Sequence, residues 1–392
     1  IIQIKETILP MFRSCLLASF LLALVACSDS NNSPSRGDSR PQPQNPAVEG
    51  PITTGGGPEC CFINFGNLVI DLRDLGVVPG DPFYAGREFD LADVGYQEKE
   101  YFISGIASSY VNTEALGEDG NWSVMEAEGA EYTTRIVVQR PIDPADFNGT
   151  VVVEWFNVTS GGDSAPDWIQ IHTELHREGY AWVGVSAQLV GIEGGSVFPL
   201  GLKEIDGERY GPLEHPGDSF AYDIFSQAAQ AVRRPVGLDP LDGLQAERMI
   251  AVGQSQSAYY LVSYYNAVNP LMDIFDGYII HSRGGTSAPL SQAPQPDVLA
   301  PALVRLREDQ AEPVIMLQTE TDLFSGLQYL PARQPDSDSI RLWEVAGSAH
   351  SDAYTALKGA SDQGNNPAIA EVISTTTARA PFIECQFPIN DG

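Results

Sequence analysis

The chain has 392 residues, and 43% of them are apolar, so it can bury a large core, and wholesale disorder is excluded. Asp and Glu outnumber Lys and Arg by 52 to 22, which gives a formal net charge of −30. A surface this acidic repels phosphate backbones, so we expect no nucleic-acid partner and interpret the charge as the well-solvated surface of an exported protein.

The first 27 residues predict an export signal, with Met11 as the expected start. Arg13 supplies the positive end, and the apolar run over 16–25 suits a signal peptide but is too short to cross a bilayer. The run leads into Leu24-Val25-Ala26-Cys27, which resembles the lipobox of bacterial lipoproteins, in which the cysteine is lipidated. We therefore expect an exported lipoprotein of the outer membrane or periplasm, anchored through Cys27, with a secreted protein as the alternative.

Residues 28–57 consist of Ser, Asn, Asp, Gln, Pro and Gly with almost no large apolar side chain, which predicts a disordered tether ahead of a domain over 58–392. A disulfide from Cys61 or Cys60 to Cys385 would join the two ends of that domain and stabilise it by about 5 kcal/mol in the loop-entropy model. Alternatively, the adjacent pair is itself oxidised. No cysteine or histidine spacing is typical of a zinc site, so we expect no metal and no cofactor.

The domain alternates apolar strands with amphipathic helices. Strands are predicted at 100–106, 132–139, 150–155, 181–186, 248–252, 276–281, 313–318 and 340–345, and helices at 167–178, at 219–232 and from the residues after 255 to 265. This order predicts the α/β class, with a mostly parallel sheet of about eight strands and helices on both faces. The segment 284–312, with a helical part at 298–307, is expected to form a small lid.

One pentapeptide, Gly253-Gln254-Ser255-Gln256-Ser257, lies between a short apolar strand and an amphipathic helix. This is the context of a nucleophile elbow, in which a sharp turn exposes a serine hydroxyl at the carboxyl end of a sheet. Small residues two before and two after the serine let the strand and the helix approach closely. Here the second small residue is Ser257 instead of glycine. The alternative is a surface turn with a serine that caps the helix.

Together with this pentapeptide, the motifs at 153–158, 320–322 and Gly347-Ser348-Ala349-His350 resemble the α/β-hydrolase superfamily, in particular its exported bacterial esterases. The resemblance covers about residues 65–390. It implies an α/β-hydrolase fold and a triad in the chain order serine, acid, histidine.

A serine nucleophile needs a general base, and His281 and His350 are the histidines that follow Ser255. His350 lies in a Gly/Ser-rich loop after the last strand, where the resemblance places the base. His281 ends an earlier strand and is expected to line the pocket or to pack beside Arg283. For the pair His172 and His176, one helical turn apart, we favour a solvated helix face over a metal site.

The acid is expected just after the strand 313–318, where Glu320 and Asp322 both qualify. The resemblance favours Asp322, the fourth residue of a turn, with Thr319 at its first position instead of glycine. Its role would be to orient His350 and to stabilise the imidazolium. Glu320 remains the alternative.

Two backbone N–H groups should form the oxyanion hole. One is that of Gln256, directly after the nucleophile. The other should come from the loop after Trp155, with Asn157 as the first choice and Val158 as the second.

These residues predict a serine carboxylic-ester hydrolase that forms an acyl-enzyme on Ser255 and acts on small-molecule or polymeric esters. The alternatives are an amidase or peptidase with the same triad and a surface lipoprotein that only binds a ligand. A binding module has no need of an intact Ser, acid and His in order, which favours the enzyme.

Overall fold

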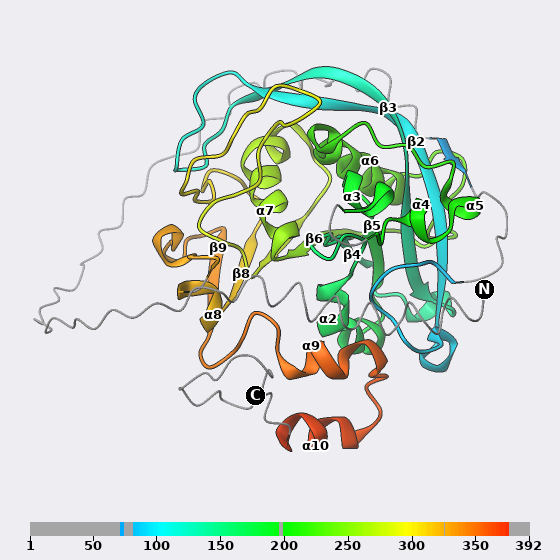
Figure 1. Cartoon of the computed structure of the whole chain (residues 1–392). Coiled ribbons are helices and arrows are strands. Elements are labelled where there is room, and N and C mark those ends of the chain that lie inside the picture. Colours follow the sequence, from blue (N-terminus) through cyan, green and yellow to red (C-terminus); the bar gives the residue numbers. More distant parts are fainter. Residues whose placement is uncertain (1–70, 74–80, 196–198, 325, 376–392) are drawn as a thin grey trace, which may run out of the picture.

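The computed structural model describes residues 71–73, 81–195, 199–324 and 326–375 of the chain (Figure 1). The expected export signal and tether, the lipobox cysteine Cys27 and the expected disulfide partners Cys61 and Cys385 all lie outside the described residues. So do the other two cysteines. None of the described helices is both long and apolar enough to span a bilayer.

A single nine-stranded sheet organises the domain, in the order β1-β2-β3-β5-β4-β6-β7-β8-β9. Strands β5, β4, β6, β7, β8 and β9 are parallel, whereas β1, β2 and β3 join them through antiparallel pairings. The strands are β1 (Asp71–Arg73), β2 (Tyr96–Asn112), β3 (Val124–Pro141), β4 (Thr150–Trp155), β5 (Ala181–Val185), β6 (Arg248–Gln254), β7 (Gly277–His281), β8 (Val314–Thr319) and β9 (Ile340–Val345).

Helices follow most of the parallel strands. They are α2 (Pro166–Arg177), α3 (Leu189–Glu193), α4 (Leu202–Ile205), α5 (Gly207–Tyr210), α6 (Ala221–Arg233), α7 (Gln256–Ser263), α8 (Glu320–Phe324), α9 (Ala353–Leu357) and α10 (Pro367–Thr375). A π-helical turn, Tyr264–Val268, continues α7. Short 3-10 turns lie at Leu91–Val94, Pro144–Asp146, Asp218–Phe220, Asn269–Leu271, Leu330–Ala332 and Gly359–Ser361.

Helices cover both faces of the sheet, as expected. On one face α6 and α7 pack on a core that includes Val151, Val153 and Trp155 of β4. On the other face α2 packs on a core that includes Val152 of the same strand (Figure 1). Every residue of β4 is buried, because a central parallel strand has no solvent-exposed side. The predicted α/β class, the mostly parallel sheet and the eight predicted strands are confirmed.

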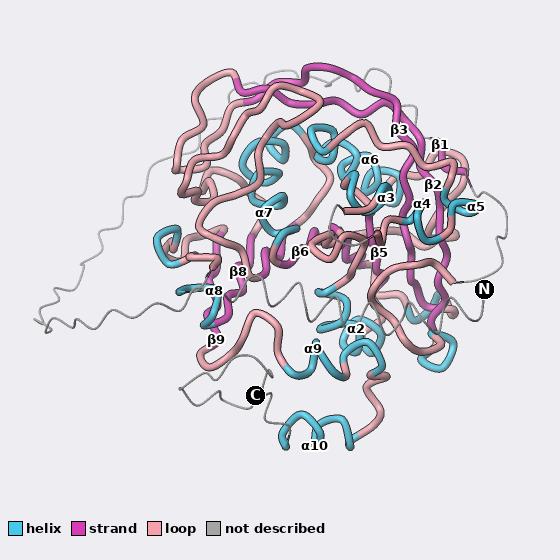
Figure 2. The backbone as a smooth tube through the Cα atoms, viewed as in Figure 1, coloured by secondary structure: helices cyan, strands magenta, loops and turns pink. Residues whose placement is uncertain are grey.

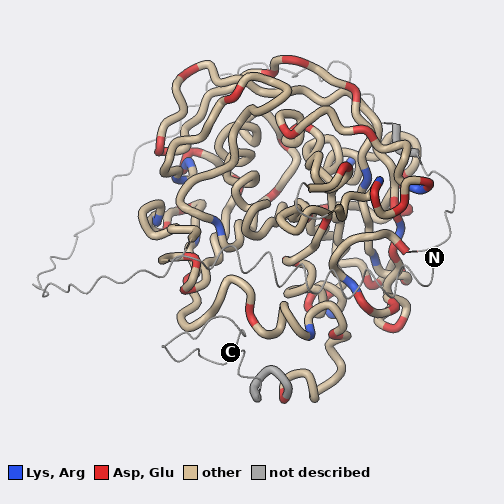
Figure 3. The backbone as a smooth tube through the Cα atoms, viewed as in Figure 1, with Lys and Arg blue, Asp and Glu red and all other residues tan. Residues whose placement is uncertain are grey.

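The first two long strands extend well beyond the predicted ranges 100–106 and 132–139. Strands β2 and β3 form a hairpin that arches over the α6 and α7 side of the domain (Figure 1). Its turn is fastened to the insert between β7 and β8, since Arg305 N donates to Glu118 O at 2.8 Å. Asp and Glu are spread around the backbone, including this arch, and form no single patch in this view (Figure 3).

The insert 284–312 does not have the predicted helix. All of its residues are described, and none of them is helical (Figure 2). Pro301 has no N–H to donate, and Val304 and Leu306, two residues apart, both point into the main core as in an extended chain. The expected lid is therefore not confirmed, because the segment packs into the domain.

Candidate active site

Ser255 stands at the junction of the central strand β6 and helix α7. Its backbone has φ 59° and ψ −116°, a region that costs a non-glycine residue about 1–3 kcal/mol. Two hydrogen bonds hold this conformation: Ser255 N–H donates to His281 O at 3.0 Å, and Tyr259 N–H donates to Ser255 O at 3.2 Å. The turn therefore presents the Ser255 hydroxyl at the carboxyl edge of the sheet.

The elbow requires a small residue at 253. A Cβ added to Gly253 would lie 3.0 Å from Ser257 Cβ and 3.1 Å from Leu261 Cδ1, so the helix lies almost against the strand. Ser257 is completely buried, and its hydroxyl has no hydrogen-bond partner among the described residues. A serine thus fits where the elbow pattern has glycine, with its hydroxyl unsatisfied.

Three side chains from separate loops form one hydrogen-bonded chain. Ser255 Oγ lies 2.9 Å from His350 Nε2, and His350 Nδ1 lies 2.7 Å from Asp322 Oδ1. A carboxylate accepts, so the proton of the neutral ring is assigned to Nδ1, and Nε2 is left to accept from the serine hydroxyl. Ser255 comes from the elbow, Asp322 from α8 after β8, and His350 from the loop after β9.

The carboxyl group of Asp322 is fully buried. Burial alone would raise its pKa, but the hydrogen bond and charge interaction with His350, together with hydrogen bonds from Ser282 and Thr319, lower the pKa of Asp322 overall. Thr319 N–H also donates to Asp322 Oδ2 at 2.7 Å. Asp322 is thus held as a carboxylate aimed at the ring.

Glu320, the alternative acid, has a different partner. Its Oε2 accepts from Gly347 N–H at 2.6 Å, which ties the histidine loop to the start of α8. Two further bonds hold the loop, from His350 N–H to Thr321 Oγ1 at 2.8 Å and from Gln254 Nε2 to His350 O at 3.2 Å. The sequence did not reveal these anchors, because they join loops that are distant along the chain.

The expectation for the second oxyanion donor needs correction. The Asn157 N–H donates to Ser164 O at 2.9 Å and closes the loop after β4, so it is not directed at the elbow. Its side-chain amide instead donates to Gln254 O at 3.0 Å and fixes the loop beside the elbow. The next N–H, that of Val158, points to the Gln256 side chain at 3.3 Å. Gln256 is the first residue of α7, so its own N–H has no acceptor within the helix.

A family profile described as "Alpha/beta hydrolase domain" matches residues 48–392. The chain belongs to this family. The match begins within the stretch that the sequence predicts as a tether. No curated protein matches the chain.

Several solved α/β hydrolase structures resemble this one at low identity. An α/β serine hydrolase without a lid from Xanthomonas campestris is 12% identical, with a TM-score of 0.32 over 62% of this chain and 86% of that one. The rice cell wall degrading esterase LipA of Xanthomonas oryzae is 12% identical, with a TM-score of 0.37 over 73% and 92%. Est1E of Butyrivibrio proteoclasticus, with ferulic acid bound, is 11% identical, with a TM-score of 0.36 over 62% and 94%.

In this α/β hydrolase, a buried glutamate on β4 accepts hydrogen bonds from the start of helix α2 and from the neighbouring strand β5. Glu154 accepts from Asp167 N–H at 3.0 Å, Trp168 N–H at 2.9 Å and the Trp182 indole N–H at 2.9 Å. Because Ala165 makes no side-chain cap, Glu154 caps helix α2 from the neighbouring strand. Burial, and then the charge of Asp167, raise the pKa of Glu154.

The remaining histidines of the α/β hydrolase are structural. His281 Nδ1 lies 2.8 Å from Asp167 Oδ1 in the buried layer beneath the elbow. His172 is buried between Trp168 O and Asp362 O, and the His176 ring packs at a tilt against the Tyr96 ring with 4.4 Å between centroids, so the predicted solvated helix face is wrong. The aromatic rings of Phe89 and Tyr96 cover this face of the helix. The sequence of the helix alone does not reveal this contact.

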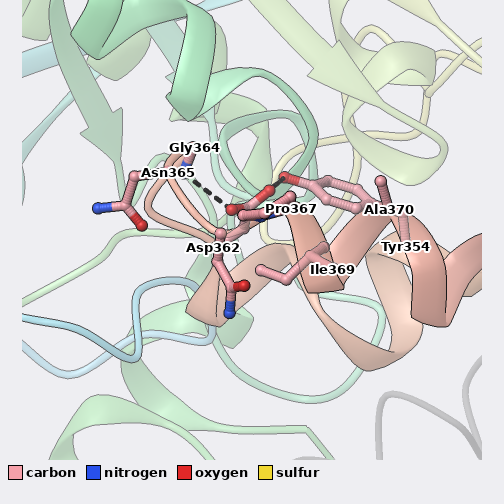
Figure 4. Close-up of a pocket in the computed structure, with 8 residues that line it drawn as sticks. Tyr354, Asp362, Gly364, Asn365, Pro367, Ile369 and Ala370 are labelled. Atoms are coloured by element: carbon pink, nitrogen blue, oxygen red, sulfur yellow. Dashed lines mark hydrogen bonds between the residues drawn. The ribbon is translucent and has the colours of Figure 1, made fainter.

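A hollow near the C-terminal end of the described chain has no triad residue in its lining (Figure 4). It lies between α9, the loop that follows and α10, and is lined by Tyr354, Asp362, Gly364, Asn365, Asn366, Pro367, Ile369 and Ala370. None of the expected site residues lines it. Among the described residues, no three His, Cys, Asp or Glu side chains are grouped as a metal site would need.

Proposed function

We propose that this protein is a serine hydrolase that cleaves carboxylic esters, small or polymeric, through an acyl-enzyme on Ser255. The observation that carries the proposal is the hydrogen-bonded chain from Ser255 Oγ through the His350 ring to Asp322, at 2.9 Å and 2.7 Å. Membership of the α/β hydrolase family supports it.

In the first half of the reaction, Ser255 Oγ attacks the ester carbonyl while His350 Nε2 accepts the hydroxyl proton. Asp322 stabilises the imidazolium that forms and stays ionised, in keeping with its lowered pKa. The imidazolium then gives its proton to the leaving alkoxide, and the alcohol departs. Water next attacks the acyl-enzyme while His350 takes its proton, the bond to Ser255 Oγ breaks, and His350 returns the proton to Ser255 as the carboxylic acid leaves.

Charge that develops on the carbonyl oxygen needs two fixed donors. We assign them to the N–H groups of Gln256 and Val158, which belong to loops joined by the Asn157 bond to Gln254 O. Such a donor, in other serine hydrolases, is worth about 3–4 kcal/mol of transition-state stabilisation. Asn157 therefore acts as a positioning residue.

A purely binding role would not require the strained elbow. Ser255 holds a φ of 59° and lies within hydrogen-bond distance of the base, and strained residues of this kind cluster at active sites. We therefore favour the enzyme over a lipoprotein that only binds a ligand. Whether the same triad also cleaves amides is tested by comparing matched ester and amide substrates.

Hydrolysis of p-nitrophenyl butyrate, compared with the matching p-nitroanilide, tests the proposal. We expect the ester to be cleaved much faster, and S255A and H350A each to lose at least about 10³-fold in kcat. Preference for the anilide would make the protein an amidase. Wild-type turnover in S255A would contradict the proposal altogether.

We further propose that the protein is exported and anchored by lipid on Cys27. The apolar run over 16–25 and the motif that ends in Cys27 support this location. Metabolic labelling with an alkyne fatty acid tests it, with C27S as the comparison. Equal incorporation into C27S would overturn the anchor, and no incorporation into the wild type would favour secretion.

A further inference from the structure

The side chain of Gln256 covers the donor that the ester carbonyl would need. Gln256 Oε1 accepts from Val158 N–H at 3.3 Å, while the backbone N–H of Gln256 is the other assigned donor. Gln256 therefore supplies one oxyanion donor with its backbone N–H and occupies the other, the Val158 N–H, with its side chain. An amide carbonyl and an ester carbonyl are the same kind of neutral acceptor, so the two compete for Val158.

The Gln256 side-chain amide cannot flip, because the groups behind it fix which of its ends is the oxygen and which is the nitrogen. Its Nε2 donates to Gln188 Oε1 at 2.7 Å, and the Trp155 indole N–H donates to the same oxygen at 3.2 Å. Gln188 Nε2 in turn donates to Asp218 Oδ2 at 3.2 Å. An indole N–H only donates and a carboxylate only accepts, so both amides have one orientation. That orientation leaves Gln256 Oε1 facing Val158.

Burial along this network falls toward the active site. Trp155 is completely buried and Gln188 is nearly so, whereas Ser255 and Gln256 are both half-buried. The Gln188 end of the network is therefore buried in the domain, and Gln256 is the more exposed end, next to the nucleophile.

We propose that the Gln256 carboxamide is a latch on the oxyanion hole, displaced when an ester carbonyl binds. This inference rests on the proposed ester hydrolysis. Exchange of one neutral carbonyl for another gains little in the ground state. The oxyanion of the tetrahedral intermediate accepts a charge-assisted bond about twice as strong, so Val158, once the substrate has displaced the latch, stabilises the transition state more than the bound ester.

Steady-state kinetics with p-nitrophenyl butyrate test the latch in Q256A, which keeps the backbone N–H. Loss of the latch raises the free energy of the unliganded enzyme relative to both bound states. We therefore expect KM to fall about 2- to 10-fold with kcat nearly unchanged. Q292A is the matched control, because Gln292 donates to the Tyr260 hydroxyl, which in turn donates to Asp218 at the far end of the network. We expect Q292A to match the wild type. Unchanged or higher KM in Q256A would overturn the latch.

Hydrogen exchange at the Val158 amide gives a readout that does not depend on turnover. The latch protects this N–H, so we expect faster exchange in Q256A than in the wild type and in Q292A. Equal exchange in all three would overturn the latch even if the enzyme is active. Wild-type turnover in S255A would instead overturn the proposed function, so the two failures are distinguishable.

Discussion

Asp322 reaches the His350 ring at 2.7 Å, although Glu320 lies only two residues away in the same helix. Glu320 bonds the Gly347 N–H and so holds the loop that carries the histidine. The two carboxylates therefore have separable roles: Asp322 orients the His350 ring, and Glu320 holds the loop that carries it.

Substitution of each carboxylate by its amide should separate these tasks. In D322N the amide no longer fixes the Nδ1–H tautomer, and we expect kcat to fall by about 10³- to 10⁴-fold. In E320Q an amide oxygen can still accept from Gly347, and we expect a loss of less than about 10-fold. The measurement is kcat for p-nitrophenyl butyrate. Equal losses in the two variants would mean that Asp322 is not the acid.

The close approach of α7 to β6 predicts that G253A damages the elbow. The added methyl would meet Ser257 and Leu261 at 3.0–3.1 Å, so we expect overpacking to cost about 1–3 kcal/mol and to lower kcat/KM. The control is G207A, where an added Cβ meets nothing within 4 Å. Urea denaturation and ester kinetics measure both effects, and a G253A protein as stable as G207A would refute the tight contact.

Asp223 on α6 should make stability depend on pH. Burial raises its pKa to about 6, against the hydrogen bonds from Ser108 N–H and the Gln227 amide that favour the carboxylate. Between pH 4 and 6 the folded carboxyl keeps a proton that the unfolded one has lost, so stability falls as pH rises through this window. The loss amounts to about 3 kcal/mol at neutral pH.

D223N cannot ionise and should lack that loss. We expect the unfolding free energy of the wild type, relative to D223N, to be about 2 kcal/mol lower at pH 7.5 than at pH 4.5, because part of the loss has already occurred at pH 4.5. Urea denaturation at the two pH values measures the difference. D273N, which changes an exposed aspartate, is the control and should follow the wild type. A wild type and D223N with parallel pH profiles would refute the assignment.

The cap that Glu154 provides for α2 predicts that E154Q is destabilised. Both oxygens of Glu154 accept from N–H groups, so a glutamine must turn its NH₂ toward a donor of Asp167, Trp168 or Trp182. We expect a loss of about 2 kcal/mol or more in the unfolding free energy. E178Q, at the exposed end of the same helix, should change it by less than about 0.5 kcal/mol. A neutral E154Q would mean that Glu154 is not needed as a cap.

The parts of this protein that could be predicted from sequence are those fixed by local pattern. The apolar runs that became β4 and β6, and the elbow between β6 and α7, follow from side-chain period and turn chemistry. The hydrogen-bonded serine, aspartate and histidine were likewise named from chain order and loop position. The strands and the elbow need only residues close together in the sequence, whereas the distant triad partners follow from the resemblance to α/β hydrolases.

The parts that could not be predicted depend on contacts between distant segments. Whether the Asn157 N–H is available depends on Ser164 across a loop, and the burial of His172 depends on Asp362, 190 residues away. The insert after β7 has residues that suit a helix, yet it packs as an extended chain into the core and bonds to the hairpin β2–β3. The spacing of apolar and polar residues along the sequence gives no information about such contacts between distant segments.

Peptide mapping of a fluorophosphonate adduct tests the central claim most directly. We expect the probe to modify one serine, Ser255, and to leave S255A unlabelled although the unfolding transition of S255A matches that of the wild type. An adduct on another residue, or equal labelling of S255A, would contradict the assignment of Ser255 as the nucleophile.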